Sequence, residues 1–301
     1  MRRPPRVGVV VLDHGRPDDA ARAVASAREP GLDVHLLIVD NPTATAEVRF
    51  HGGASADRVE RVCPRENLGF GGGMNLGIER LSRRDCDCFL LLNNDAVLEP
   101  GCLRLLTEAL SDRRVAATGP VILREADRRV ESRGLSVDLR WGRVRLAGHG
   151  EPPPHDERLM RCDALSGAVL LVGRVALERV GLLDADYFFG FEDVDWCLRA
   201  RRAGLEVAAV HGAHAVHEGG LTLGRSSPAR LYYAARNHLR CVERHLPLRG
   251  PARLLRRAAV LGLNLSFALR QDEVPRMAAA GAVAHGIRDA CRCRFGSRAS
   301  A

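Results

Sequence analysis

Short apolar runs alternate with helix-like segments over roughly the first two hundred residues. The apolar runs consist mostly of Val, Leu and Ile and end at polar or turn residues, as strands do. They are residues 7–12, 36–40, 59–63 and 89–92. The helix-like segments between and after them are residues 18–28, 74–82 and 102–110. This alternation predicts an α/β domain with a mainly parallel sheet and helices on both faces.

The pattern is interrupted at residues 128–156, which are rich in Arg and Gly and contain Trp141 and three consecutive prolines. We expect a hairpin or flap here. The alternation then resumes. The later strands are expected at 168–172 and 207–210, and the later helices at 174–180 and 193–203. From Ser227-Pro228, a typical helix start, the remaining chain is predicted to be helical and strongly basic.

Composition narrows the class of protein. A hydrophobic content of 46% supports a real core, and the net charge of +8 suits anionic partners such as nucleotide phosphates, acidic lipids or nucleic acid. The nine cysteines include no C-x-x-C pair, which argues against a zinc ribbon. Their odd number and the absence of a signal-peptide pattern favour reduced thiols in a cytoplasmic protein. The longest apolar stretch, residues 258–269, is too short to span a bilayer, so a soluble or peripherally attached protein is expected.

Acidic residues follow the predicted strands, and parallel sheets bind ligands at the carboxyl ends of their strands. Asp40 ends one strand and can accept a hydrogen bond from a pyrimidine N3–H. Asp95 follows another and is a hard oxygen ligand for Mg²⁺ or Mn²⁺. Each acid has a plainer interpretation as a turn residue. The glycine-rich segment at 69–73 lacks the spacing of a dinucleotide-binding fingerprint, which disfavours a nicotinamide oxidoreductase.

A second acidic group lies at the start of the helix predicted near residue 193. Glu192, Asp193 and Asp195 fall where the helix dipole stabilises anions, so one of them can act as a base. We expect Asp195 to cap the helix. Three histidines follow the strand at 207–210, and a neutral imidazole from this group can complete a metal shell. They are His211, His214 and His217.

Several motifs occur in a specific order along the chain. They are Val9–Leu12, Ile38–Asn41, Asn67–Ile78, Leu91–Asp95, Ser166–Ala168, Phe188–Asp195 and His214–His217. Together they resemble glycosyltransferase family two, and most closely its rhamnosyltransferase-like branch. The resemblance covers roughly residues 6 to 245 and implies a Rossmann-like fold of the GT-A type. It divides the chain into a catalytic domain, residues 1–226, and a basic C-terminal helical region, residues 227–301. Within the catalytic domain, a nucleotide half extends to about residue 125 and an acceptor half covers about 126–226.

At matching positions the resemblance implies roles for individual residues. The expected donor-binding residues are Leu12, Asp13, His14, Asp40, Asn67, Gly71, Asn75, Asn93, Asn94 and Asp95. The expected acceptor-binding residues are Trp141, Ser166, Gly167 and Glu192. Asp193 resembles the catalytic base, with Glu192 beside it, and Asp95 and His217 resemble the ligands of a divalent cation, Mg²⁺ or Mn²⁺.

The implied reaction is inverting transfer of a sugar, rhamnose or another hexose, from a dTDP- or UDP-sugar to a hydroxyl of a glycan, lipid-linked or small-molecule acceptor. Two departures from the family pattern occur. The first strand leads into Asp13-His14 in place of Asn-Tyr-Asn, so His14 must substitute for a stacking tyrosine. The metal motif is Asn-Asn-Asp, with Asp95 its only acid. This second departure motivates an alternative, a non-catalytic protein that binds nucleotide sugars.

The basic region at residues 253–294 allows two interpretations. It is either an amphipathic attachment to anionic lipid at the inner face of the membrane or a helical cap with a solvated basic face. Nucleic acid is not an expected partner, because no aromatic stacking platform or known reader motif accompanies the arginines.

Overall fold

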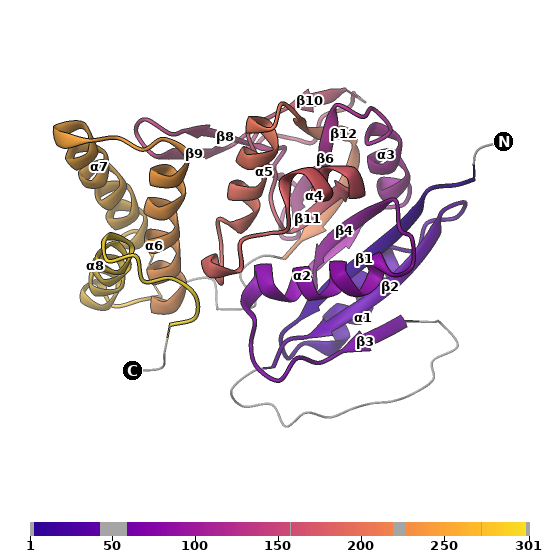
Figure 1. Cartoon of the computed structure of the whole chain (residues 1–301), viewed down its shortest axis with the longest axis horizontal. Coiled ribbons are helices and arrows are strands. Elements are labelled where there is room, and N and C mark those ends of the chain that lie inside the picture. The colour runs from indigo at the N-terminus through magenta and orange to yellow at the C-terminus, as the bar shows by residue number, and fades with distance from the viewer. Residues whose placement is uncertain (1–2, 43–58, 157, 219–226, 272, 299–301) are drawn as a thin grey trace.

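The computed structural model describes residues 3–42, 59–156, 158–218, 227–271 and 273–298. One large sheet forms the centre of the molecule, and a group of C-terminal helices lies beside it (Figure 1). The sheet order is β10-β12-β6-β11-β4-β1-β2-β3, with β5 paired to β12 and β7 paired to β6.

The N-terminal half of the sheet is parallel. Its strands are β1 (Arg6–Asp13), β2 (Asp33–Asp40), β3 (Val59–Val62) and β4 (Cys88–Asn93). β1 pairs in parallel with both β2 and β4, and β2 pairs in parallel with β3. Nearly continuous apolar runs are typical of parallel strands that are covered on both faces. The four strands predicted from these runs are therefore confirmed.

The other half of the sheet is mixed. Its strands are β5 (Ala96–Leu98), β6 (Val115–Arg124), β7 (Val130–Ser132), β10 (Leu159–Arg161), β11 (Val169–Gly173) and β12 (Glu206–His217). β11 is antiparallel to both of its neighbours, β4 and β6, whereas β12 is parallel to β6. The strand predicted at 207–210 ends too early, because β12 continues to His217 through a register shift between Val210 and His214.

Helices cover both faces of the sheet, as predicted (Figure 1). They are α1 (Pro17–Ser26), α2 (Gly69–Ser82), α3 (Cys102–Ala109), α4 (Arg174–Val180) and α5 (Glu192–Arg202). The sheet has a hydrophobic core on each face, and alternate residues of β1 point into one core or the other. Val9 and Val11 pack with α1 and α3, whereas Val10 packs with α2 and α5. This period-two alternation is what a strand covered on both sides requires.

Helix α2 begins at Gly69 and not near Met74, so the glycine-rich segment is the first turn of the helix. The glycines allow α2 to lie very close to β1. A Cβ atom on Gly73 would overlap Leu12, and one on Gly77 would overlap Val10. The predicted helix began at residue 74, after the glycines, because glycine has low helix propensity; close packing against the strand outweighs that cost.

The segment predicted as a hairpin contains one. β8 (Leu135–Asp138) and β9 (Arg143–Leu146) form a separate two-stranded sheet that extends toward the C-terminal helices (Figure 1). Those helices are α6 (Pro228–His245), α7 (Gly250–Ala268) and α8 (Arg276–Cys291). Among the described residues, no helix combines the length and the apolar character needed to cross a bilayer.

Candidate active site

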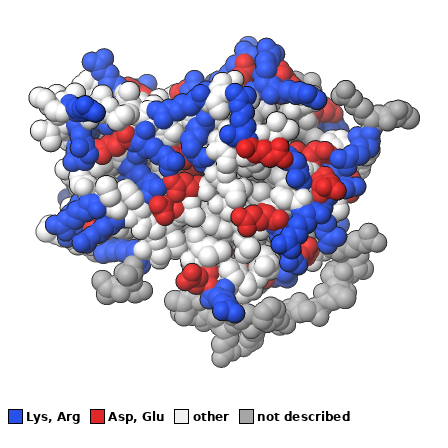
Figure 2. Space-filling model, viewed as in Figure 1, with Lys and Arg blue, Asp and Glu red and all other residues white. Residues whose placement is uncertain are grey.

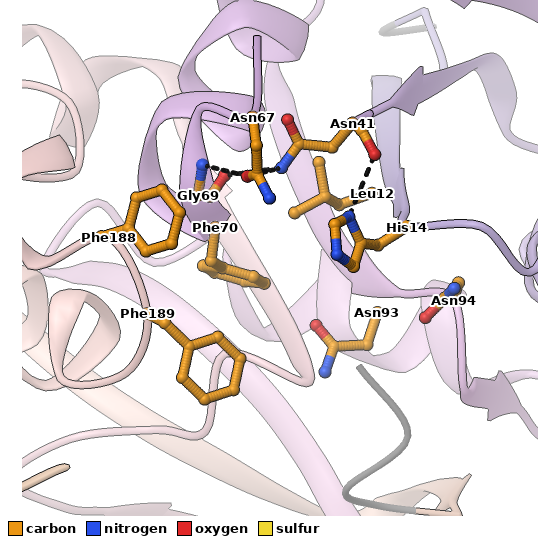
Figure 3. A pocket seen from close by; sticks show the side chains of 10 residues that line it. All are labelled: Leu12, His14, Asn41, Asn67, Gly69, Phe70, Asn93, Asn94, Phe188 and Phe189. Atoms are coloured by element: carbon orange, nitrogen blue, oxygen red, sulfur yellow. Dashed lines mark hydrogen bonds between the residues drawn. The ribbon is translucent and has the colours of Figure 1, made fainter. Parts of the chain in front are cut away.

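A pocket opens at the carboxyl ends of β1, β2 and β4, beside the N-terminus of α2. About 530 Å³ of space not filled by protein atoms lies within it, including solvent at its open mouth. The lining residues are Leu12, His14, Asn41, Asn67, Gly69, Phe70, Asn93, Asn94, Phe188 and Phe189. Figure 3 shows the phenylalanines on one side of the pocket and His14, Asn93 and Asn94 on the other. Leu12, His14, Asn67, Asn93 and Asn94 were expected here from the sequence.

Asn41 organises one wall of this pocket (Figure 3). Its side-chain Nδ2 donates to Oδ1 of Asn67 at 2.8 Å, and its Oδ1 accepts from the backbone N–H of Leu68 at 2.9 Å. Its backbone carbonyl accepts from Nδ1 of His14 at 3.0 Å. Asn41 is buried, so these bonds fix the start of α2 to the end of β2. It was not among the predicted site residues, although it directly follows Asp40 in a quoted motif.

Asp13 and Asn94 join the ends of β1 and β4. Oδ1 of Asp13 accepts from Nδ2 of Asn94 at 3.0 Å and from the backbone N–H of Arg16 at 2.9 Å. Both side chains are buried. Asp13 therefore supports the strand ends and the entry to α1, whereas Asn94 also lines the pocket.

Asp40 lies at the end of β2, as predicted, but outside the pocket lining. Nη1 of Arg61 lies 3.0 Å from its Oδ1 and 3.2 Å from its Oδ2. Burial raises the pKa of Asp40; Arg61 opposes this effect, and the nearby Asp13 adds to it. A ligand that bonds to Asp40 therefore shares this carboxylate with Arg61 or displaces the guanidinium.

Two other predicted donor residues lie on the inner side of α2. Nδ2 of Asn75 donates to the backbone carbonyl of Leu183 at 2.8 Å, and Oδ1 of Asn75 accepts from the backbone N–H of Leu183 at 3.1 Å. A Cβ on Gly71 would lie 3.4 Å from the carbonyl oxygen of Asp184. Both residues thus hold the 182–189 segment against α2. A direct contact of either one with a donor stays a prediction.

Asp95 and His217 lie next to each other, because β5, which directly follows Asp95, pairs with the end of β12, which contains His217. Oδ1 of Asp95 lies 3.3 Å from Nε2 of His217, and Nδ1 of His217 is 2.9 Å from Oε2 of Glu131. Burial lowers the pKa of His217, but bonds to Asp95 and Glu131 outweigh burial and raise it to about 10. The other two predicted histidines pair elsewhere: His211 with Asp156, and His214 with Glu99.

The Asp95 and His217 pair fits part of a divalent cation shell. Oδ1 of Asp95 is buried and has no partner with hydrogen-bond geometry in the described part of the chain. The carboxylate oxygen of Asp95 and the Nε2 atom of His217 therefore face each other. Glu131 orients the imidazole ring through its other nitrogen, as outer-shell carboxylates do at metal sites. No group of three or more His, Cys, Asp or Glu side chains gathers as a metal site among the described residues. Mg²⁺ tolerates so few protein ligands, because it commonly keeps water and binds substrate phosphates.

Asp193 lies in the first turn of α5 and contacts the segment that precedes β11. The backbone N–H of Gly167 donates to its Oδ2 at 2.6 Å, and that of Val194 donates to its Oδ1 at 2.8 Å. Burial raises the pKa of Asp193, and these N–H groups oppose the shift. A Cβ on Gly167 would lie 3.3 Å from Cζ of Phe70, so this contact adjoins the pocket.

Glu192 and Ser166 are the neighbours of this pair. Glu192 is buried, its Oε2 has no hydrogen-bond partner in the described structure, and burial together with the charge of Asp193 raises its pKa well above the ordinary value. Oγ of Ser166 accepts from the backbone N–H of Ala168 at 3.3 Å. The structure thus brings the predicted base and three predicted acceptor residues together.

Asp195 does not cap α5, contrary to the prediction. Its carboxylate is fully buried and accepts from Nε of Arg199 at 2.8 Å, from the hydroxyl of Tyr187 at 3.2 Å and from Nε2 of His245 at 2.9 Å. It therefore joins α5 to α6. A cap was expected from its position near the helix start, but the contact with His245 brings together residues that are far apart in sequence.

Helix α6 also fixes the segment that carries the pocket phenylalanines. Nδ2 of Asn237 donates to the carbonyl oxygens of Tyr187, Phe189 and Gly190 at 2.8, 2.9 and 2.8 Å, and Asn237 is fully buried. Backbone φ angles are positive at Phe188 (62°), Gly190 (81°) and Phe191 (75°). Such conformations persist when surrounding contacts hold them. Asn237 is a positioning residue that the sequence analysis missed.

Trp141 lies away from these residues. It is in the turn between β8 and β9, is 49% exposed, and lines a separate groove with Arg143 and the α7 residues Ala259, Gly262, Leu263 and Ser266. The structure therefore does not bring Trp141 together with the other predicted acceptor residues.

Comparison with known proteins identifies relatives over most of the chain. The model of a family described as glycosyltransferase like family 2 matches residues 5–243. The dTDP-rhamnosyl transferase RfbF of Shigella flexneri is 22% identical over 227 residues, which cover 71% of this chain and 73% of that protein. The N-acetylglucosaminyl-diphospho-decaprenol L-rhamnosyltransferase of Mycobacterium tuberculosis strain H37Rv is 31% identical over 186 residues, or 55% of this chain and 60% of that one.

Solved structures share the fold at low identity. The mannosyltransferase PcManGT from Pyrobaculum calidifontis, in complex with GDP-Man and Mn²⁺, has a TM-score of 0.58 and 16% identity, covering 97% of this chain and 87% of that one. GalNAc-T7 with UDP, GalNAc and Mn²⁺ has a TM-score of 0.62 and 15% identity. The match covers 81% of this chain and 48% of GalNAc-T7, so this chain spans about half of that protein.

The fold and the site at its strand ends define a nucleotide-sugar-dependent glycosyltransferase of the GT-A type. The chain belongs to glycosyltransferase like family 2. The two rhamnosyltransferases among its relatives confirm the resemblance to the rhamnosyltransferase-like branch.

Proposed function

We propose that this protein is an inverting glycosyltransferase that moves rhamnose or another hexose from a dTDP- or UDP-sugar to an acceptor hydroxyl. The observation that carries this proposal is the half-buried carboxylate of Asp193, held by the N–H of Gly167 beside the pocket at the strand ends. The names of the rhamnosyltransferase relatives support the choice of rhamnose.

In this proposal Asp193 is the general base. It removes the proton from the acceptor hydroxyl while that oxygen attacks the anomeric carbon and the nucleoside diphosphate leaves. Burial raises the pKa of Asp193, which makes its carboxylate a stronger base than one in water. The N–H of Gly167 keeps Oδ2 in place, and Oδ1 accepts from the N–H of the neighbouring Val194.

The donor occupies the pocket. His14 and the phenylalanines provide flat surfaces for the nucleotide and sugar, while Asn67 and Asn93 provide polar groups. Asp40 recognises the base through the pyrimidine N3–H. The acceptor lies against Ser166, Gly167 and Glu192, because these residues adjoin Asp193.

Asp95 and His217 would hold a divalent cation, Mg²⁺ or Mn²⁺, which when bound supplies positive charge to the leaving diphosphate. Two solved proteins of the same fold contain Mn²⁺, which supports this assignment. His217 must lose a proton to bind metal, since its raised pKa keeps the ring charged between the two carboxylates. Glu131 then holds the ring through Nδ1.

A thermal-shift screen of dTDP, UDP, GDP and their sugars, each with and without Mn²⁺, tests the donor site. A ligand that binds only the folded form raises the melting temperature. We expect a shift with dTDP or UDP that depends on Mn²⁺ and disappears with EDTA or in Asp95→Asn. Asp127→Asn is a matched control on an exposed loop and should keep the shift. No shift with any nucleotide would contradict the proposed donor site.

The alternative is a protein that binds nucleotide sugars without catalysis. It is motivated by Asn93 and Asn94, which occupy positions where carboxylates would strengthen a metal site. Both functions give a thermal shift, so the shift does not separate them. Release of nucleoside diphosphate from the bound donor does, because a pure binder releases none.

A further inference from the structure

Helix α7 buries Val260 and Ala268 but also leaves several large apolar side chains exposed, which is unusual for a surface helix. Arg256 is 1% exposed, whereas Leu255 and Phe267 are 61% and 53% exposed. Residues 258–269 include no charged side chain. An apolar surface that the rest of the chain leaves uncovered marks an interaction site.

The β8–β9 hairpin extends this apolar surface. Trp141 at its turn lines a groove with Leu263 of α7. The neighbouring Gly142 has a φ of +70°, and a Cβ there would overlap Val260, so the turn is packed tightly onto α7. We use the term α7 face for Trp141, Leu255, Leu263 and Phe267 together.

Arginines border the α7 face on the hairpin side. Arg140, Arg143 and Arg145 are exposed, and none forms an ion pair within the part of the chain that the structure describes. Figure 2 shows uncharged surface over α7, at the upper left, with Arg side chains around it. By contrast, Arg253 and Arg257 on α7 are both paired with Glu243. The hairpin therefore supplies three of the charges that are available to a partner.

We propose that the α7 face docks on the surface of an anionic lipid bilayer. Exposed leucines, a phenylalanine and a tryptophan can enter the boundary between head groups and acyl chains, and the bordering arginines attract anionic head groups. A second copy of the chain fits less well. A two-fold dimer through this face would bring the same unpaired arginines of both copies together. This proposal goes beyond the transfer reaction and does not depend on it.

The proposal changes the expectation drawn from residues 253–294. Arg256 is buried and Arg257 is ion-paired, so these two arginines of the basic stretch are not available to lipid. The helices α6 and α8 pack together as a cap, since Tyr232 of α6 bonds to Asp289 of α8 at 2.9 Å. Both interpretations of residues 253–294 then apply. The side of this region that packs within the protein is a helical cap, and the outer side of α7 contacts the bilayer.

Co-sedimentation of the full chain with vesicles tests this assignment. Vesicles of phosphatidylcholine with phosphatidylglycerol should bind the wild-type protein, and phosphatidylcholine alone should bind it much less. The double variant Leu263→Ser, Phe267→Ser should lose about tenfold or more of the binding, because two apolar side chains no longer enter the bilayer. Arg140→Glu with Arg143→Glu should weaken binding in the same direction, as should high salt.

Val175→Ser is the matched control. Val175 is 75% exposed on α4, so its replacement should leave vesicle binding unchanged. All substituted side chains are exposed, and an unchanged nucleotide-induced thermal shift would show that each variant is folded. Wild-type protein that fails to bind anionic vesicles would overturn the proposal, as would a double variant that binds as well as wild type. Wild-type dimers in light scattering that the double variant lacks, without vesicle binding, would instead assign the α7 face to a second copy.

Discussion

The backbone N–H of Gly167 lies 2.6 Å from Oδ2 of Asp193. This bond joins the segment before β11 to the first turn of α5, two elements that meet only in the folded chain. A Cβ at residue 167 would lie 3.2 Å from the same Oδ2, so a side chain there would push the carboxylate out of place. Glycine at this position therefore fixes where the proposed base lies.

Gly167→Ala should slow glycosyl transfer by about a hundredfold, because displacing a catalytic group by a fraction of an ångström lowers the rate steeply. Donor affinity should fall much less than the rate, because Phe70 is the pocket residue that the added Cβ meets, at 3.3 Å from its Cζ. Steady-state kinetics and a donor titration measure the two effects. Gly173→Ala is the control, since a Cβ there has no neighbour closer than 3.8 Å. Equal loss of affinity and rate in Gly167→Ala would argue against a role through Asp193.

The buried carboxyl of Glu192 predicts a pH-dependent stability. Its pKa is raised above the ordinary value of 4.5 by burial and by the charge of Asp193. The folded state therefore holds a proton that the unfolded chain releases, and the stability this provides is lost as pH rises from 4.5 through the raised pKa. Urea unfolding of wild type and Glu192→Gln across this range should show that the variant gains stability relative to wild type as pH rises. A constant difference would contradict the raised pKa.

Asn237→Ala should reduce both stability and activity. The change removes an amide whose two N–H groups are shared among three carbonyl oxygens of the segment that carries Phe188 and Phe189. The carbonyl of Tyr187 keeps a bond from Arg236, whereas those of Phe189 and Gly190 lose this donor, and each buried group left unpaired costs about 1–3 kcal/mol. The transfer rate should fall even at temperatures where the variant is fully folded, because the positive φ angles of this segment lose their support. Thr107→Val, which also removes a buried bond, is distant in α3 and should affect stability alone.

Two glycine substitutions separate close packing from helix propensity. Gly73→Ala should lower the free energy of unfolding by about 1–3 kcal/mol, since the added Cβ meets Leu12 of β1. Gly281→Ala in α8 should raise it by up to about 1 kcal/mol, because a Cβ there meets no atom within 4 Å and alanine favours a helix. Chemical denaturation compares the two. A stable Gly73→Ala protein would contradict the proposed contact between α2 and β1.

The sequence was most informative where local patterns dominate. Apolar runs predicted β1, β2, β3, β4 and β11, whereas the assignment of Asp95 and Asp193 to one site, made from the order of motifs, stays a prediction. β6 was missed because Ala116-Ala117-Thr118-Gly119-Pro120 has little strand propensity; its burial in the middle of the sheet overrides that composition.

The remaining errors concern contacts between distant segments. Asp195 bonds to His245, fifty residues along the chain, and Trp141 packs on α7 more than one hundred residues away. Neither contact has a local signal. Asn41 had one, since it directly follows Asp40, but its role as an organiser of the pocket depends on Asn67 and His14. The long-range arrangement of helices therefore decides which polar residues support the site.

Release of nucleoside diphosphate from dTDP-rhamnose and UDP-hexoses, with Mn²⁺ and with wild type and Asp193→Asn compared side by side, tests the central claim most directly. The account predicts release by the wild type with at least one donor. It also predicts that Asp193→Asn binds that donor normally and releases diphosphate about 10²–10⁴ times more slowly, the usual contribution of a general base. An Asp193→Asn protein as fast as wild type, or a wild-type protein that binds a donor and never releases diphosphate, would contradict it.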